Sequence, residues 1–364
     1  AITLGGPGAV FWMWVIALFG ASSAFIESTL AQLYKVHGHN SFVGGPAYYM
    51  KKGLKQPWMG ILFAFLLIFT FGFAFNSVQS NTICAAFEEA FNISPALMGC
   101  ILTALTLIII FGGIQRIAKV SSIIVPIMAL GYIFLALFIV IMNVKHLPGV
   151  IELIIENAFG WEQALGGGIG MALMQGIKRG LFSNEAGMGS TPHAHAVAKV
   201  EHPAEQGLVA IFGVFATLIV VTFTGIVILV TGVLDFQSTG IALTQKAYNV
   251  GLGSFGVSFV AICLFFFAYS TIIGWYFFAE QNVRFLFSEK ALLPYRVIVC
   301  AFIIVGATLK VDLVWALADL FNGLMVIPNL IALIALHKVV GNCLDDFEAK
   351  LAKYEKTQQN ISHS

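Results

Sequence analysis

Polar and charged residues interrupt one otherwise apolar segment near the middle of the chain. The stretch 175–192 reads QGIKRGLFSNEAGMGSTP and holds four glycines, one proline and three charged side chains. An unbroken helix in lipid does not tolerate this composition, whereas a helix interrupted beside a polar cavity does. The interruption would expose backbone N–H and C=O groups and two half-helix ends, which suit a zwitterion or a small cation. A cytoplasmic loop between two shorter helices is the alternative.

A second polar group lies in NSVQSN, residues 76–81. Asn76 and Gln79 are three residues apart, so a helix places both side chains on one face. Gln79 offers both a donor and an acceptor, which a zwitterionic ligand needs. Hydrogen bonds between helices explain the same residues equally well, so the sequence leaves both interpretations open.

A third group occupies YSTIIGW, residues 269–275. Ser270 and Thr271 are neighbouring hydroxyls that could supply oxygen ligands to a hard cation such as Na⁺. In membrane helices such hydroxyls more often bond to their own backbone. Thr271 and Trp275 share a helix face at i, i+4, which places an aromatic wall one turn from the hydroxyls. Trp275 could equally be ordinary packing.

Asp319 and Asn322 form a fourth group in the last apolar segment. A carboxylate within a membrane segment suggests a functional site. A hydrogen bond that holds a kinked helix would explain Asp319 equally well. His193 and His195 stand at i, i+2, which does not place both on one helical face, so we expect no metal centre. Because the chain has no nucleophile elbow, phosphate loop or HExxH sequence, we do not expect an enzyme.

These groups lie in a chain whose composition is typical of a membrane protein. Of its 364 residues, 59% are hydrophobic and only 10% are charged, and the mean hydropathy is +0.91. Soluble domains carry roughly a quarter charged residues, so an ordinary globular protein is excluded. The 19 Lys and Arg residues nearly balance the 18 Asp and Glu residues, which excludes a nucleic-acid binder. The five cysteines form no CxxC pair, so we expect neither disulfides nor a zinc site.

The sequence predicts nine membrane-spanning segments, because a spanning helix needs about 20 mostly apolar residues. The runs are long and do not alternate with period two, so helices rather than barrel strands are expected. The eighth segment counts as a span only if Arg296 extends its charge to the interface. The predicted spans are 8–34, 59–87, 95–113, 117–143, 161–198, 205–233, 254–287, 293–309 and 313–337.

The positions of the basic residues predict the orientation of these spans. With nine spans, the loops of one side hold most of the Lys and Arg residues, including all four lysines between positions 35 and 55. The loops of the opposite side hold only Lys145, Lys246 and Lys310. The carboxyl terminus is therefore expected in the cytoplasm, and Ala1 is expected outside.

Five segments resemble motifs of the sodium:alanine (alanine/glycine:cation) symporter family, and together they cover essentially the whole chain. The most specific is GGPGAVFWMWVIALFG at residues 5–20. The others follow in the expected order: GGPAYYM at 44–50, NSVQSN at 76–81, KRGLFSNEAGMGS at 178–190 and STIIGW at 270–275.

The resemblance implies an all-α fold of two inverted five-helix repeats, shared by the amino acid–polyamine–organocation superfamily. Residues 1–143 would then be an incomplete first repeat of four spans, and 144–160 an external connection. Residues 161–338 would be the second repeat with its broken first helix, and 339–364 a charged cytoplasmic tail. Repeat one lacks the symmetry partner of the broken helix, and the chain does not begin with methionine. We therefore expect that amino-terminal spans are missing.

The resemblance also implies import of alanine or glycine, coupled to Na⁺ or to H⁺, across a prokaryotic cytoplasmic membrane. From the family's corresponding helix, Ser270 and Thr271 are the expected cation ligands. We expect the substrate at Gln79, Gly176, Ile177, Gly180 and Trp275. Na⁺ is the coupling ion and no other cofactor is expected; the expected assembly is a monomer in the bilayer. A channel or a non-transporting amino-acid receptor on the same scaffold is the alternative.

Overall fold

Almost every described residue of the chain is helical. The computed structural model describes residues 1–38, 41–160, 168–234 and 238–362. Within these ranges the strands are one short antiparallel pair, β1 (Val36–His37) with β2 (Phe42–Val43), and loops join the helices. The helices are α1 Ile2–Gly5, α2 Gly8–Leu33, α3 Pro46–Lys52, α4 Pro57–Leu67, the π-helix η1 Ile68–Ala74, α5 Phe75–Phe91, α6 Pro95–Ile110, α7 Gly113–Met142, η2 Val144–His146, α8 Leu147–Phe159, α9 Gly168–Asn184, α10 Pro192–Val197, α11 Pro203–Val230, α12 Ile241–Leu252, α13 Ser254–Phe287, η3 Glu289–Ala291, α14 Leu292–Thr308 and α15 Val311–Ser362.

Seven helical stretches within these described ranges are long and apolar enough to cross a membrane. Each overlaps a predicted span, and the chain is therefore a multi-pass membrane protein with a helical architecture. Nine spans are not confirmed. Helix α6 has only 16 residues, and the predicted span 161–198 is divided between α9 and α10, with 161–167 outside the described residues. The seven stretches are Gly8–Leu33, Pro57–Phe91, Ser122–Met142, Pro203–Val230, Ser254–Phe287, Glu289–Thr308 and Val311–Glu355.

The arginine in α14 is paired with residues of the neighbouring helix α13. Arg296 donates from Nε to the hydroxyl of Tyr276 at 2.9 Å, and its Nη2 lies 3.6 Å from Glu280. The guanidinium also lies over the ring of Phe111. Pairing with a carboxylate and an aromatic face stabilises a charge in an apolar helix.

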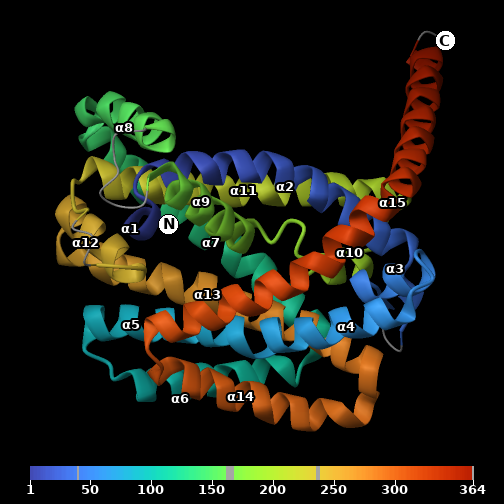
Figure 1. Cartoon of the computed structure of the whole chain (residues 1–364), viewed down its shortest axis with the longest axis horizontal. Helices are drawn as coiled ribbons and strands as arrows, with labels where there is room; N and C mark the ends of the chain where they lie inside the picture. The colour runs from blue at the N-terminus through green and yellow to red at the C-terminus, as the bar shows by residue number, and fades with distance from the viewer. Residues whose placement is uncertain (39–40, 161–167, 235–237, 363–364) are drawn as a thin grey trace.

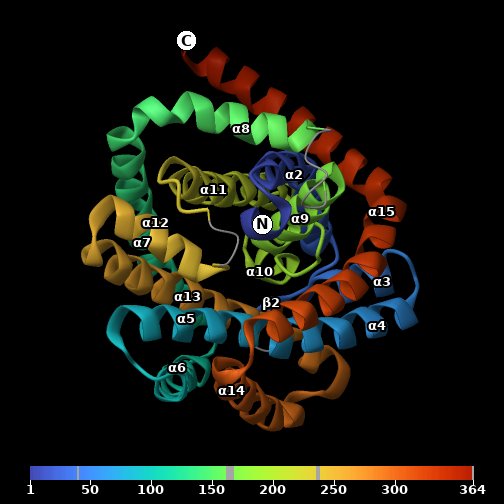
Figure 2. The same ribbon diagram turned by 60° about the vertical axis from the view of Figure 1, so that its left-hand side comes forward.

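The helices form two packed groups around α13. Helices α2, α9 and α11 lie side by side, while α5 packs against α13 and α14 (Figures 1 and 2). One hydrophobic core lies among η1, α5, α13, α14 and α15, and a second lies among α7, α11, α12 and α13. Helix α8 lies at the periphery, and the carboxyl end of α15 projects from the body (Figure 1).

A non-helical segment, residues 185–191, separates α9 from α10. Gly187 and Gly189 have φ of 83° and 82° there, conformations that glycine adopts without a Cβ penalty. Pro192 then begins α10 at a position where its missing N–H costs nothing. The interruption lies further along than expected, because Gly176, Ile177 and Gly180 are inside α9. We call residues 185–191 the break segment.

Helix α15 runs without interruption through Pro328 and through the expected boundary at 338/339. The residues 339–362 of the expected charged tail are therefore a continuation of the last membrane helix. This continuity also places Asp319 and Asn329 on a single rigid element that passes the break segment.

Candidate functional site

The break segment is held by a carboxylate on α2. Glu27 is 0% exposed, and its two oxygens accept the backbone N–H groups of Gly187 and Gly189 at 3.1 Å each. The hydroxyl of Thr191 donates to the same carboxylate at 3.5 Å. A buried carboxylate requires such donors, and the non-helical backbone supplies them because its N–H groups have no helical partner.

Asn329 on α15 completes the contacts of this carboxylate. Its Nδ2 donates to Glu27 at 3.0 Å and to the carbonyl of Gly187 at 2.9 Å. The hydroxyl of Tyr49 on α3 donates to the Asn329 side-chain oxygen. All three side chains are fully buried. Helices α2, α3 and α15 are thus joined to the break segment by one hydrogen-bonded group, which we call the Glu27 cluster.

Gly189 is surrounded so closely that no side chain fits. A Cβ at this position would lie 2.7 Å from both Phe63 and Pro46 and 3.0 Å from Asn329. The close approach of these three side chains to the backbone, together with the positive φ, explains why the sequence has glycine here.

A second carboxylate belongs to Glu185, the first residue of the break segment. The hydroxyl of Ser190 donates to Glu185 at 2.6 Å, and the indole N–H of Trp275 on α13 donates to it as well. Trp275 is 3% exposed and its ring contacts Phe75 and Phe182 with centroids 5.0 and 5.8 Å apart. The aromatic wall expected at Trp275 therefore lies directly beside the break segment.

Helix α10 is held in place by contacts of its two histidines. His193 contacts the Ser190 carbonyl through Nδ1 at 2.8 Å and the amide of Asn282 through Nε2 at 2.8 Å. His195 contacts Gln206 at 2.8 Å. Among the described residues no group of three His, Cys, Asp or Glu side chains could hold a metal ion. All five cysteines are free.

The predicted substrate residues on α9 precede the break segment in the sequence, and the two glycines among them lie against α2. A Cβ on Gly176 would overlap Trp12, and a Cβ on Gly180 would overlap Ile16. Both glycines therefore allow α2 and α9 to pack closely, as small residues do between membrane helices. Ile177 is half-buried on the same helix. Nothing in this packing tests a contact with substrate.

Gln79 lies on α5, one turn after Phe75, whose ring contacts Trp275. Its side chain is half-buried and makes no hydrogen bond with the described part of the chain. The neighbouring Asn81 behaves differently, because its amide donates to the carbonyls of Gly306 and Leu309 at 3.0 and 2.8 Å. Hydrogen bonding between helices therefore explains Asn81 but leaves the donor and acceptor of Gln79 free for a ligand.

The hydroxyls of Ser270 and Thr271 both donate to the carbonyl of Phe267, at 2.8 and 2.9 Å. This is the local bonding expected of hydroxyls in an unbroken helix. Each oxygen keeps lone pairs that could accept a cation.

Asp319 on α15 forms ion pairs with two basic residues of α9, so its role is not limited to a hydrogen bond within its own helix. Arg179 on α9 donates to it at 2.7 Å, and Lys178 lies 3.6 Å away. The Arg179 guanidinium lies 4.4 Å from the ring centroid of Trp315. Arg179 and Trp315 border a cavity of about 360 Å³ that also touches α1, α11 and α12. Phe182 lines the same cavity and contacts Trp275, so the cavity is two side chains away from Glu185.

Sequence reasoning missed Glu27, the residue with the most contacts to the break segment. The available signal was an acidic residue inside the first apolar span, since a carboxylate in a membrane segment is itself a functional-site indication. Glu185 stood within the predicted stretch 175–192 but was not assigned a role. The partners of Glu27 are all distant in sequence, and Glu185 has one near partner, Ser190, and one distant partner, Trp275.

The chain matches the family described as the sodium:alanine symporter family over residues 1–361. It is 52% identical to the "Probable sodium/glutamine symporter GlnT" of Bacillus subtilis, over 95% of this chain and 73% of that protein. It is 48% identical to the B. subtilis "Amino-acid carrier protein AlsT", over 95% and 75%. It is 42% identical to the "Sodium/alanine symporter AgcS" of Methanococcus maripaludis, over 93% and 77%.

These similarities extend over nearly all of the chain and do not confirm the expectation that amino-terminal spans are missing. The matched family is one of transporters and not of enzymes. The family expected from five short motifs is therefore the family that the whole chain matches. The chain, with its helices arranged around the break segment, belongs to the sodium:alanine symporter family.

Proposed function

We propose that this chain imports a small neutral amino acid, alanine or glycine, together with Na⁺ by alternating access between the two sides of the membrane. The observation that carries the proposal is the break segment, where Glu27 and Asn329 hold non-helical backbone between two half-helices. Interrupted helices supply substrate and ion sites near the middle of transporters because their backbone groups are free of helical bonds.

The substrate would lie between α5, α9 and α13. Gln79 has free hydrogen-bonding groups, Trp275 supplies an aromatic wall, and Gly176, Ile177 and Gly180 are the proposed contacts on α9. The ring contacts of Trp275 with Phe75 and Phe182 support this arrangement, since they bring α5 and α9 to the same indole. An enclosed aromatic wall would select small side chains by overlap with larger ones.

Ser270 and Thr271 are the proposed Na⁺ ligands. They stand one turn before Trp275 on α13, so a cation there would lie close to the proposed amino-acid site. If both ligands favour the same conformation, each raises the affinity for the other by the same factor. H⁺ is the alternative coupling ion.

The identity of the amino acid is the finer part of the proposal. Alanine agrees with the family description and with the name of the relative from Methanococcus maripaludis. The Bacillus subtilis relative at 52% identity is instead named for glutamine. We further propose a prokaryotic cytoplasmic membrane as the location, with the carboxyl terminus of α15 in the cytoplasm and the protein acting as a monomer. The excess of lysine in the loop before α4 supports this orientation.

Uptake by the intact protein in proteoliposomes tests the proposal. An inward Na⁺ gradient should concentrate labelled alanine above the external level, and unlabelled glycine should compete with it. Replacement of external Na⁺ by choline at constant pH should abolish accumulation. A proton gradient that drives the same accumulation without Na⁺ would reject Na⁺ coupling, and competition by glutamine but not glycine would reject the proposed substrate class.

A further inference from the structure

A long apolar groove runs along the outer surface between η1, α14 and α15. Its volume is about 780 Å³, and its lining is almost wholly hydrocarbon and aromatic. Phe69 and Phe73 of η1 face Phe302 of α14 and Phe321 of α15 across it. Leu309 and Val314 line one end, and Ala291 and Phe287 line the other.

The groove extends along α14, whose length is close to the thickness of a bilayer's hydrocarbon region. Ala291 and Leu309 flank α14 at its two ends, and a helix of that length spans about 25 Å at 1.5 Å per residue. A typical hydrocarbon core is about 30 Å thick. The groove therefore follows the direction in which acyl chains lie.

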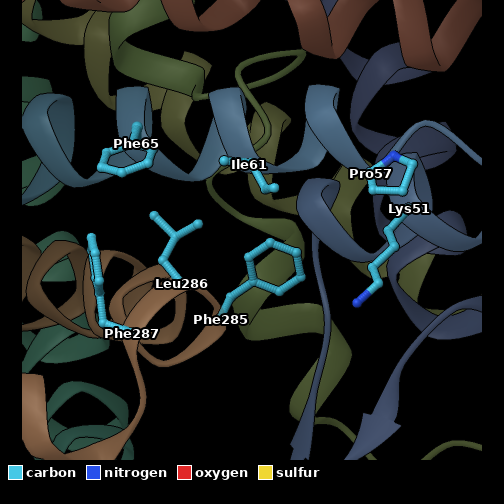
Figure 3. Close-up of a pocket in the computed structure, with 7 residues that line it drawn as sticks. All are labelled: Lys51, Pro57, Ile61, Phe65, Phe285, Leu286 and Phe287. Atoms are coloured by element: carbon cyan, nitrogen blue, oxygen red, sulfur yellow. The ribbon is translucent and has the colours of Figure 1, made fainter.

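A second, smaller cavity of about 300 Å³ continues from the Phe287 end of this groove. Phe65 and Phe287 line both cavities, so the two are contiguous. Figure 3 shows Lys51 of α3 below Pro57 at one side of the smaller cavity, with Phe285 next to Lys51 and Phe287 at the far side.

Lys51 gives the smaller cavity a positive charge. Its side chain is exposed, and its Nζ lies 5.8 Å from the centroid of the Phe285 ring. Within the described ranges no carboxylate is paired with it. Trp58, 62% exposed at the start of α4, marks the same end as a membrane interface, where tryptophan is enriched.

We infer that this composite site binds an anionic phospholipid, with its phosphate at Lys51 and an acyl chain between Phe65 and Phe287 into the groove. A basic group at the interface attracts anionic headgroups. The apolar lining of the groove offers an acyl chain an environment as favourable as the surrounding lipid. The lipid is distinguished from ordinary surrounding lipid by the cavity that receives its headgroup.

The bound chain would lie against η1, whose opposite side faces the candidate transport site. Phe69 and Phe73 line the groove, while Phe71 of the same π-helix contacts Trp275 with ring centroids 5.4 Å apart. A π-helix is rare and occurs mostly as a single turn inside α-helices, frequently at functional sites. Lipid occupancy would therefore stabilise η1 next to the indole that donates to Glu185.

Lipid titration of the delipidated protein, followed by native mass spectrometry, tests the headgroup contact. Phosphatidylglycerol should bind more tightly than phosphatidylcholine, and Lys51→Ala should weaken phosphatidylglycerol binding by about fivefold, the contribution of one lysine near an anionic headgroup. Lys52→Ala is the matched control, because Lys52 is equally exposed on α3 but does not line the cavity. Equal effects of the two substitutions, or equal binding of the two lipids, would overturn the headgroup assignment.

A pair of substitutions on α14 tests the acyl-chain contact. Ile298 lines the groove, whereas its neighbour Val297 is exposed and does not line it. Ile298→Trp should fill the groove and reduce the tightly bound lipid, and Val297→Trp should leave binding unchanged. Hydrogen exchange of residues 68–75 should slow with phosphatidylglycerol in the wild type and in Val297→Trp alone. The proposal would be overturned if Ile298→Trp bound as much lipid as the wild type, or if the lipid did not slow hydrogen exchange of residues 68–75. Both outcomes are independent of any transport measurement.

Discussion

The side-chain amide of Asn329 donates to the carboxylate of Glu27 at 3.0 Å, although 302 residues separate them in the chain. The same amide donates to the Gly187 carbonyl, while Glu27 accepts the Gly187 N–H. Side chains of two helices, α2 and α15, thus hold the N–H and the C=O of the same residue of the break segment. Any movement of α9 and α10 relative to α2 or α15 must stretch or exchange these bonds.

Glu27→Gln should destabilise the protein and abolish concentrative uptake. A carboxylate accepts both backbone N–H groups, whereas the amide turns an N–H toward one of them and leaves a buried donor without a partner. Such a loss costs about 1–3 kcal/mol, which thermal unfolding in detergent would detect. Glu152→Gln, on the exposed side of α8, should change neither property. Equal stability and uptake of the two variants would remove Glu27 from the site.

Gly189→Ala should be far more harmful than the same change elsewhere in a membrane helix. Its Cβ would meet Phe63 and Pro46 at 2.7 Å, and φ is 82°. Gly213 in α11 has no neighbouring atom within 4 Å of such a Cβ, and Gly213→Ala should stabilise its helix by about 0.5–1 kcal/mol. The two unfolding midpoints provide the check. A tolerated Gly189→Ala would show that the break segment is not closely packed.

Thr271→Ala should raise the Na⁺ concentration needed for half-maximal uptake by removing one oxygen ligand. Thr217→Ala is a matched control, because Thr217 also donates to the carbonyl four residues earlier, in α11. Uptake is measured against Na⁺ concentration for both variants. A lower maximal rate with unchanged Na⁺ dependence in Thr271→Ala would reject the ligand role.

Trp275→Ala should widen the range of competing amino acids to include valine and leucine. Trp275→Phe keeps a ring but loses the bond to Glu185, so it should weaken uptake without widening the range. Trp58→Ala, at the exposed start of α4, should do neither. Competition against labelled alanine distinguishes these outcomes. If Trp275→Ala transports alanine yet still excludes large side chains, Trp275 does not set substrate size.

Gln79→Ala should weaken the binding of every substrate by the same amount, about 1–3 kcal/mol for a lost buried partner. Gln79 has no protein partner in the described residues, so its removal breaks no bond within the fold. Binding constants for alanine and glycine, together with the unfolding midpoint, provide the measurement. A fall in stability with unchanged affinity would assign Gln79 to packing.

A cysteine in place of Lys51, in a background without the five native cysteines, should resist an impermeant thiol reagent in intact cells. A cysteine in place of Lys145, in the connection before α8, should react with it. The expectation follows from the excess of basic residues in cytoplasmic loops. The reverse labelling pattern would invert the proposed orientation.

The membrane helices were the most predictable part of the fold, because long apolar runs must become helices in lipid. Even the weak segment at Arg296 is a helix. The sequence could not reveal why, since its partners Glu280 and Tyr276 belong to the preceding helix and are placed beside it only by folding.

The candidate site was partly predictable. Glycines and charges between positions 175 and 192 indicated an interruption, but composition could not distinguish the glycines that pack α9 on α2 from those that bend the backbone. Gly176 and Gly180 belong to the first kind, and Gly187 and Gly189 to the second. Glu27 was missed because its donors lie 160 and 162 residues away, a distance over which sequence spacing gives no contact.

Counterflow tests the central claim most directly. Proteoliposomes containing the intact protein are loaded with unlabelled alanine and diluted into Na⁺ buffer with a trace of labelled alanine. A transporter that exchanges one bound amino acid for another predicts a transient accumulation of label above equilibrium, which Glu27→Gln should lose and Glu152→Gln should keep. Label that only approaches equilibrium from below in the wild type would indicate a channel or a non-transporting receptor and would contradict the account.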